Sequence, residues 1–255
     1  VRKKAYESGD DRLWFIYLCT AANNVAFGIY GQCTDLIATN PYRLGYRLGK
    51  SENAQFIQEE EEYFEWVRQA AQPRPWGWLP EAFCFPGRKR MMEPGELRLL
   101  MYGALAHGVR MIRYYTSTEG AGIVGFEKSV SLSAEMKKLN REVKGLEPIL
   151  SAAAPISSET LGNEGEIRVN TLWSVDEGML VIVRNLDYST DRQSNELGAK
   201  PRFKNKPKDG LKIRVAKPDW LNVGEVVEPL SRQPVAHRVA NGEIELDVGH
   251  LDLAQ

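Results

Sequence analysis

The sequence predicts an α/β protein in two parts: a parallel sheet with crossover helices over residues 1–155, and a small antiparallel β-sandwich over residues 156–255. Two observations support this division. In the first part, short apolar runs alternate with helical segments, which is the pattern of a parallel sheet. From about Pro155, strand-like runs follow one another with turn residues between them, as in β-sandwiches.

Four apolar runs are the predicted strands of the parallel sheet. The first, Leu13 to Cys19, is continuously apolar and suits a strand that is buried on both faces. In the second, Asn40 and Pro41 mark the end of the strand. The four predicted strands cover residues 13–19, 33–42, 75–83 and 109–116.

Helical patterns separate these strands. Residues 53–72 place their apolar side chains near one face, and the acidic run at 59–62 is predicted to be the solvated side of that helix. In residues 93–108, Pro94 suits the first turn and Gly108 the end of a helix. The last helix, which follows the fourth strand, carries apolar residues at spacings of four, three, four and three: Leu132, Met136, Leu139, Val143 and Leu146.

The last hundred residues read as a small antiparallel β domain. Alternation with a period of two is clear in the final run, at Ile244, Leu246 and Val248. The polar stretch 187–210 is predicted to be an exposed, mobile loop. The predicted strands lie within residues 167–175, 178–188, 210–220, 224–230, 234–242 and 243–251.

Composition restricts the classes of function. The chain has 255 residues and a net charge of −1 without a long basic stretch, which argues against a nucleic-acid surface. No apolar run reaches the length of a membrane span, so we expect no membrane partner. Three cysteines without a CxxC spacing argue against a zinc site or a disulfide framework, and we expect no metal and no cofactor.

The chain starts at Val1 in what resembles the middle of a helix, so we expect it to be a piece of a longer protein. Four βα units alone would leave sheet edges and an apolar inner face uncovered. We therefore expect the isolated chain to self-associate, as a homo-oligomer or an aggregate, unless its missing half is supplied. The compartment stays open between secreted, periplasmic and cytoplasmic.

The stretch PWGWLPEAF, residues 75–83, contains the main candidate site residue. Alternate residues of a strand face opposite sides, so Trp76, Trp78 and Pro80 share one face, and Glu81 lies on the other with Gly77. Tryptophans suit the face that packs on a layer of helices, and small residues suit the narrow interior of a barrel, so we expect Glu81 on the inner face. Because Pro80 cannot donate a ladder hydrogen bond, regular pairing should stop there, leaving Glu81 at the carboxyl end of the strand.

Polar residues end the neighbouring strands as well. Asn40 and Tyr42 follow the second strand, and Tyr114 and Glu119 follow the fourth. Parity allows only one of Tyr114 and Tyr115 to face the interior. A carboxylate with tyrosines and an asparagine around it resembles a sugar site. We therefore predict Tyr42, Asn40, Tyr114 and Glu119 as substrate-binding residues around Glu81.

The order of these segments resembles the last strands of clan-A-type (β/α)₈ glycoside hydrolases, of the β-galactosidase-like group. The likeness rests on NPYR, on WGWLPEAF, and on a helix of the type E-x-R-x-x-x-Y-x-A-x-x-x-G before the last strand. Here that helix pattern is matched by Glu96, Arg98, Tyr102, Ala104 and Gly108.

The resemblance implies a partial TIM barrel, with strands five to eight and their helices, followed by a β-sandwich domain. It also implies a retaining glycosidase in which Glu81, at the end of strand seven, is the nucleophile. The acid/base partner belongs to strand four in this family, which is upstream of Val1. The substrate would be an oligo- or polysaccharide; the sugar and the linkage stay open.

Two other functions remain open. One is a non-catalytic carbohydrate-binding or scaffold protein with a degenerate barrel, which the absence of an acid from strand four would favour. The other is a different barrel enzyme, such as a lyase or an aldolase. No lysine ends any of the four strands, which argues against Schiff-base chemistry, and no Gly-rich loop suits a phosphate.

Overall fold

A computed structural model of the chain describes residues 7–9, 13–19, 24–41, 56–84, 90–115, 123–161, 166–190 and 203–254. The chain divides into two compact units. Unit 1 comprises Val1–Glu135 and Thr190–Arg202, and unit 2 comprises Met136–Ser189 and Phe203–Gln255. This division falls inside helix α5 (Val130–Ala152). In the sequence, by contrast, the change from alternating strands and helices to successive strands comes at about residue 155. The domain limits 1–155 and 156–255 stay a proposal.

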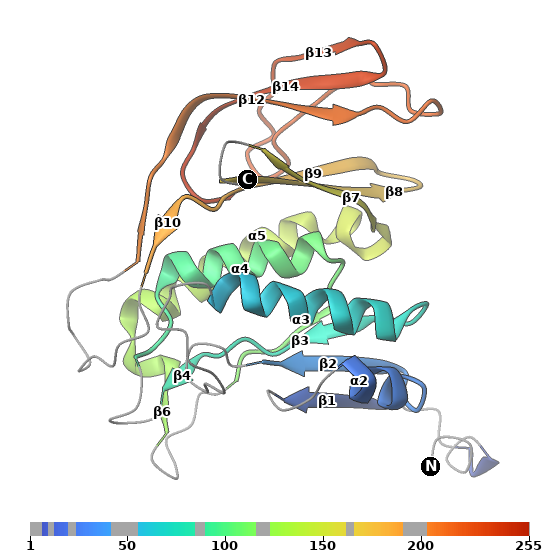
Figure 1. Ribbon diagram of the computed structural model, residues 1–255, viewed down its shortest axis with the longest axis vertical. Helices are drawn as coiled ribbons and strands as arrows, with labels where there is room; N and C mark the ends of the chain where they lie inside the picture. The colour runs from blue at the N-terminus through green and yellow to red at the C-terminus, as the bar shows by residue number, and fades with distance from the viewer. Residues whose placement is uncertain are drawn as a thin grey trace. The chain divides into compact units, whose positions relative to one another are not determined.

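Unit 1 is built on a four-stranded parallel sheet, as predicted. Its order, β1-β2-β3-β5, follows the chain, and helices come between the strands (Figure 1). A short antiparallel pair lies beyond β3. The elements are β1 (Phe15–Cys19), α2 (Asn24–Gly31), β2 (Leu36–Asn40), α3 (Phe56–Ala71), β3 (Trp76–Trp78), β4 (Phe83–Cys84), α4 (Pro94–Ala106), β5 (Met111–Ile112), β6 (Val124–Gly125) and η1 (Phe126–Lys128), with α5 after them.

The two faces of this sheet differ in residue size. We call the face that carries Ala38 and Gly77, which are partners in the β2–β3 ladder, the inner face. The other face meets the helices. The ring centroid of Phe64 in α3 lies 5.6 Å from the ring centroid of Trp76 and 5.3 Å from that of Trp78. The two indole N–H groups donate to the carbonyl of His107 and to the carboxylate of Glu60, respectively. The prediction that both tryptophans face the helices is confirmed.

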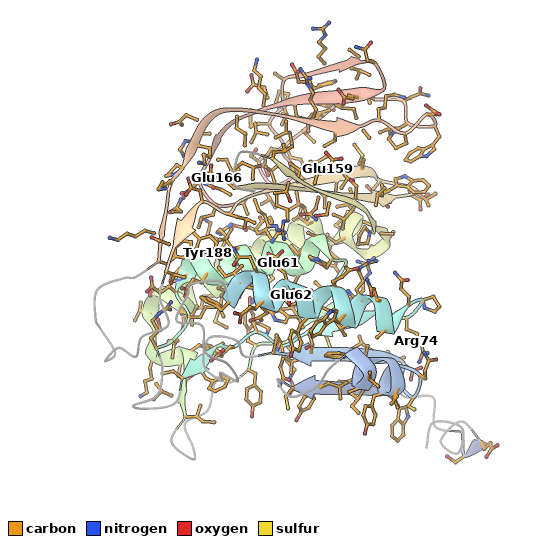
Figure 2. The ribbon with its side chains drawn as sticks, in the orientation of Figure 1. Glu61, Glu62, Arg74, Glu159, Glu166 and Tyr188 are labelled. Atoms are coloured by element: carbon orange, nitrogen blue, oxygen red, sulfur yellow. The ribbon has the colours of Figure 1, made fainter. Side chains whose placement is uncertain are left out.

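The acidic run at 59–62 is not solvated as predicted. Glu60 and Glu61 are 1% and 4% exposed, whereas Glu62 is exposed; Figure 2 labels Glu61 and Glu62 on α3. The reason is helical spacing, because residues three and four apart share a face. Glu60 and Glu61 therefore belong to the same buried stripe as Phe64, and Glu60 accepts the indole hydrogen bond of Trp78 at 2.8 Å.

Helix α4 has well-defined ends, as its sequence predicts. Glu93 precedes Pro94, and its backbone N–H donates to the Glu96 carboxylate at 2.8 Å. At the other end, Gly108 has a φ of +74°, which favours glycine. The N–H of Val109 donates to the carbonyl of Ala104, and that of Gly108 to Leu105, which is the Schellman pattern.

Unit 2 consists mainly of two three-stranded antiparallel sheets, with orders β7-β8-β9 and β12-β14-β13 (Figure 1). The two sheets share one apolar core, to which Val169 and Val183 contribute from one sheet and Ile213 and Leu246 from the other. The strands are β7 (Ala154–Leu161), β8 (Ile167–Ser174), β9 (Gly178–Asn185), β10 (Tyr188–Ser189), β11 (Lys204–Asn205), β12 (Lys208–Ala216), β13 (His237–Ala240) and β14 (Glu243–Leu251).

Two predictions for unit 2 need correction. Residues 224–230 form no strand; one isolated bridge joins Val227 to Pro234, because Glu228 instead closes a turn with Gln233 and Arg232. The predicted loop 187–210 contains the paired strands β10 and β11 and the first residues of β12, and its middle, residues 191–202, lies outside the described residues. Among the described helices, none has the length and apolarity needed to cross a membrane.

Candidate functional site

Glu81 follows β3 at the carboxyl end of the parallel sheet. Regular pairing of β3 ends at Trp78, as Pro80 predicts, but one further bridge joins Glu81 to Tyr115. Tyr115 donates its N–H to the carbonyl of Pro80 at 3.2 Å and accepts the N–H of Ala82 at 2.7 Å. The backbone on both sides of Glu81 is therefore fixed by the neighbouring strand.

The strand register places Glu81 on the inner face. Gly77 pairs with Met111, and Glu81 pairs with Tyr115, so the offset between the two strands stays constant. Because side chains alternate along a strand, Glu81 and Tyr115 lie on the same face as Gly77. Asn40 ends β2 two residues after Ala38, the ladder partner of Gly77, and therefore shares this face as well.

The inner-face site is closely packed in this structure. Glu81 is 1% exposed and Asn40 is 2% exposed, whereas Tyr115 is 40% exposed. The ring of Phe83 meets the ring of Tyr115 edge-on, with centroids 5.6 Å apart. Burial and the nearby charge of Glu81 raise the pKa of the Cys84 thiol, which favours the protonated form of that side chain.

Tyr114 and Tyr115 are placed the other way round from our prediction. Tyr114 is one residue from Tyr115, so parity turns it to the helix face. Burial, together with the negative charge of Glu135 in α5, raises the pKa of the Tyr114 phenol and keeps it protonated. The tyrosine that accompanies Glu81 is therefore Tyr115. Parity alone could not choose between them, because the choice depends on the register with β3.

Two predicted site residues, Tyr42 and Glu119, lie outside the described residues. So do Arg88 and Lys89, the first two residues of a short basic run at 88–90. Its third member, Arg90, is 4% exposed. Arg90 donates to the Glu96 carboxylate at 2.8 Å and to the Thr190 hydroxyl at 2.8 Å.

Sequence reasoning also missed the burial of Glu60. A carboxylate within a run of four acids gives no sign of burial unless the helix phase is applied to it. At the end of α4, the Nδ1 atom of His107 lies 2.8 Å from the carbonyl oxygen of Gly103. In the part of the chain that the structure describes, no three His, Cys, Asp or Glu side chains are grouped to hold a metal ion.

No protein-family model and no curated protein matches this chain. Among solved structures, the chain is similar to an α-fucosidase of Thermotoga maritima in complex with fucose, with 11% identity and a TM-score of 0.41. The match covers 88% of this chain and 52% of the fucosidase, so the chain spans about half the length of that enzyme.

A β-L-arabinopyranosidase of Geobacillus stearothermophilus is also similar, with 11% identity and a TM-score of 0.31. That match covers 91% of this chain and 57% of the arabinopyranosidase. Both proteins are glycoside hydrolases. With both TM-scores below 0.5, the resemblance is distant and says nothing of catalysis in this chain.

Proposed function

We propose that the four-stranded sheet is one half of a (β/α)₈ barrel and that the protein is a retaining glycoside hydrolase with Glu81 as its nucleophile. The observation that carries this proposal is the position of Glu81, a carboxylate on the inner face at the carboxyl end of a parallel strand. Parallel α/β proteins carry their chemistry at this end of the strands.

In the proposed reaction, the Glu81 carboxylate attacks the anomeric carbon and the glycosidic bond breaks. A covalent glycosyl ester forms, and water then hydrolyses it. A second carboxyl group about 5 Å away must protonate the leaving oxygen and later activate the water. We assign no such group among the described residues. Asn40 and Tyr115 are proposed to bind sugar hydroxyls; Tyr42 and Glu119 keep that predicted role.

The first test replaces Glu81 with Gln, which keeps the shape of the side chain and removes its negative charge. The full-length protein, with its complete barrel, would be assayed as wild type and as Glu81→Gln on aryl β-D-galactosides, α-L-fucosides and β-L-arabinopyranosides and on a panel of polysaccharides. We expect kcat of Glu81→Gln to fall by at least about a thousand-fold, because removal of a nucleophile removes the covalent route.

Glu60→Gln is the matched control. Glu60 is also 1% exposed, but it lies in α3, against the helix face of β3, where a glutamine can still accept the indole N–H of Trp78. Its kcat should stay near that of the wild type. Equal losses in both variants, or unchanged turnover in Glu81→Gln, would contradict the role of Glu81.

A second candidate function is carbohydrate binding without hydrolysis. The burial of Glu81, at 1% exposure, favours it, because a nucleophile must reach its substrate. Under this alternative, no substrate of the panel is turned over by the wild type, and sugars that bind do so equally well to Glu81→Gln. Turnover that depends on Glu81 excludes it.

A further inference from the structure

Two tryptophans of unit 2, Trp173 and Trp220, pack against each other at one end of its sheets. The ring centroids of Trp173 and Trp220 lie 4.3 Å apart, and the ring planes are tilted by 34°. Trp173 is near the end of β8 and is partly covered, whereas Trp220 is 51% exposed. One side of the Trp220 indole therefore rests on Trp173, and the rest of the ring is open to solvent.

The backbone around Trp220 is anchored within unit 2. Trp220 lies in a turn after β12, in which the N–H of Leu221 donates to the carbonyl of Pro218 at 3.0 Å. The N–H of Lys217 donates to Gly242 at 2.8 Å, which ties this turn to the loop between β13 and β14. In Figure 1, the β8–β9 turn and the chain after β12 lie at the same, right-hand end of unit 2. The backbone on both sides of Trp220 is thus anchored before any ligand arrives.

Carboxylates lie beside this pair in the sequence. Asp176 and Glu177 form the turn after β8, and Asp219 directly precedes Trp220; all three are exposed. Within the described ranges, no hydrogen bond or ion pair engages these three side chains. Since three residues span at most about 10 Å, Asp176 stays close to Trp173. Hydrogen-bond acceptors next to an open aromatic ring suit a ligand with both apolar C–H groups and hydroxyl donors.

We propose that the exposed side of Trp220, backed by Trp173, binds a pyranose ring of an oligo- or polysaccharide at a second site, separate from Glu81. The ring stacks its C–H groups on the indole, and its hydroxyls donate to the carboxylates of Asp219 and Asp176. The choice of a carbohydrate over another amphipathic ligand rests on the proposed function, whereas the geometry of the pair does not.

Affinity gel electrophoresis tests this site without any need for turnover. The chain and its variants would be run through native gels that contain soluble xylan, galactan, mannan or mixed-linkage β-glucan. We expect at least one polysaccharide to retard the wild type. Trp220→Ala should weaken that binding by at least about tenfold, as truncation of an aromatic anchor does, and Trp220→Tyr should retain most of it.

Val239→Ala is the control, because Val239 is an exposed apolar residue of unit 2, on β13, away from the pair in sequence. It should be retarded like the wild type. Thermal melting of each variant would show that the fold is retained. If no gel retards the wild type, or if Trp220→Ala is retarded as strongly as the wild type, the proposal is overturned and Trp220 only covers the end of the sandwich. Glu81→Gln should still be retarded, so a failure of the proposed hydrolysis would leave this result unchanged.

Discussion

Gly77 shows how closely the inner face of the sheet is packed. A Cβ atom at this position would lie 2.8 Å from the Met111 terminal methyl, and 3.2 Å from the Cβ atoms of both Met111 and Ala38. The methyl group can move, but the two Cβ atoms are fixed by the backbone. Only glycine therefore lets the strands before Glu81 keep this spacing.

We predict that Gly77→Ala lowers the free energy of unfolding by about 1–3 kcal/mol, the usual cost of overpacking. Gly28→Ala is the matched control: a Cβ there meets nothing within 4 Å, and the residue lies inside α2. It should raise the free energy of unfolding by up to about 1 kcal/mol through helix propensity. Urea denaturation measures both. Equal stability of Gly77→Ala and the wild type would contradict the packing described.

For single residues, the sequence predicts which way a side chain faces better than it predicts which residues that side chain contacts. The alternation of side chains along the strand is enough to place Glu81 on the other face from the two tryptophans. It could not choose Tyr115 over Tyr114, because that choice requires the register between two strands far apart in the chain. It also failed for Glu60, where the residue type suggested solvent and the helix phase placed the side chain against Trp78.

Among the elements, α4 begins with a buried ion pair. Its first turn holds Glu96, which is 0% exposed and pairs with Arg90, itself 4% exposed. The hydroxyl of Thr190 also donates to Glu96. This cluster therefore joins Arg90 and Thr190, which are a hundred residues apart in the chain, to the start of α4.

We predict that Glu96→Gln destabilises the protein by about 3–5 kcal/mol, because it removes the nearest counter-charge of the buried Arg90 guanidinium and leaves only the Glu93 carboxylate, 4.0 Å away. The double variant Arg90→Met with Glu96→Gln should lose clearly less than the sum of the two single variants, as expected for residues that interact directly. Denaturant unfolding of the four proteins completes the cycle. Additive losses would show that the pair contributes no coupling.

The ends of α4 were predictable because they depend on local signals, Pro94 at the start and Gly108 at the end. The Arg90–Glu96 pair was not, since Arg90 stands in a basic run that normally indicates solvent. The missed region at 224–230 has a similar cause. Its valines favour a strand, but the turn closed by Glu228 takes precedence over that local preference.

At the scale of the whole molecule, exposed apolar side chains gather at one edge of the sheet in unit 1. Strand β1 was predicted to be buried on both faces, and this is wrong: its residues alternate between exposed and partly exposed, because β1 ends the order β1-β2-β3-β5. Helix α2 follows β1. An open edge strand flanked by apolar side chains is a template for association. Among the described residues of this region, the exposed large apolar side chains are Leu13, Phe15, Tyr17, Val25, Ile29 and Tyr30.

We therefore predict that the isolated chain self-associates through β1. Light scattering after size exclusion should show a mass that increases with concentration. Tyr17→Lys places a charge on the edge strand and should shift the protein towards the monomer. Val175→Lys, at a 76% exposed turn position of unit 2, should not change the association. A wild type that stays monomeric at all concentrations would contradict this prediction.

The alternation of strands and helices, the parallel sheet and the later antiparallel sheets are all predictable from patterns in the sequence. Those patterns are local: apolar runs, helical periodicity and turn residues. The limits of the two units are not predictable in the same way. They depend on which segments far apart in the chain come together, such as the inclusion of residues 190–202 in unit 1.

The central claim, that Glu81 is the nucleophile of a retaining glycosidase, is tested most directly by trapping the covalent intermediate. The full-length protein, with its complete barrel, would be incubated with the activated 2-deoxy-2-fluoro derivative of whichever glycoside it hydrolyses, and its peptides analysed by mass spectrometry. We predict one added glycosyl group on the peptide that contains Glu81, and none in Glu81→Gln. A glycosyl group on another carboxylate, or hydrolysis without any trapped ester, would contradict the claim.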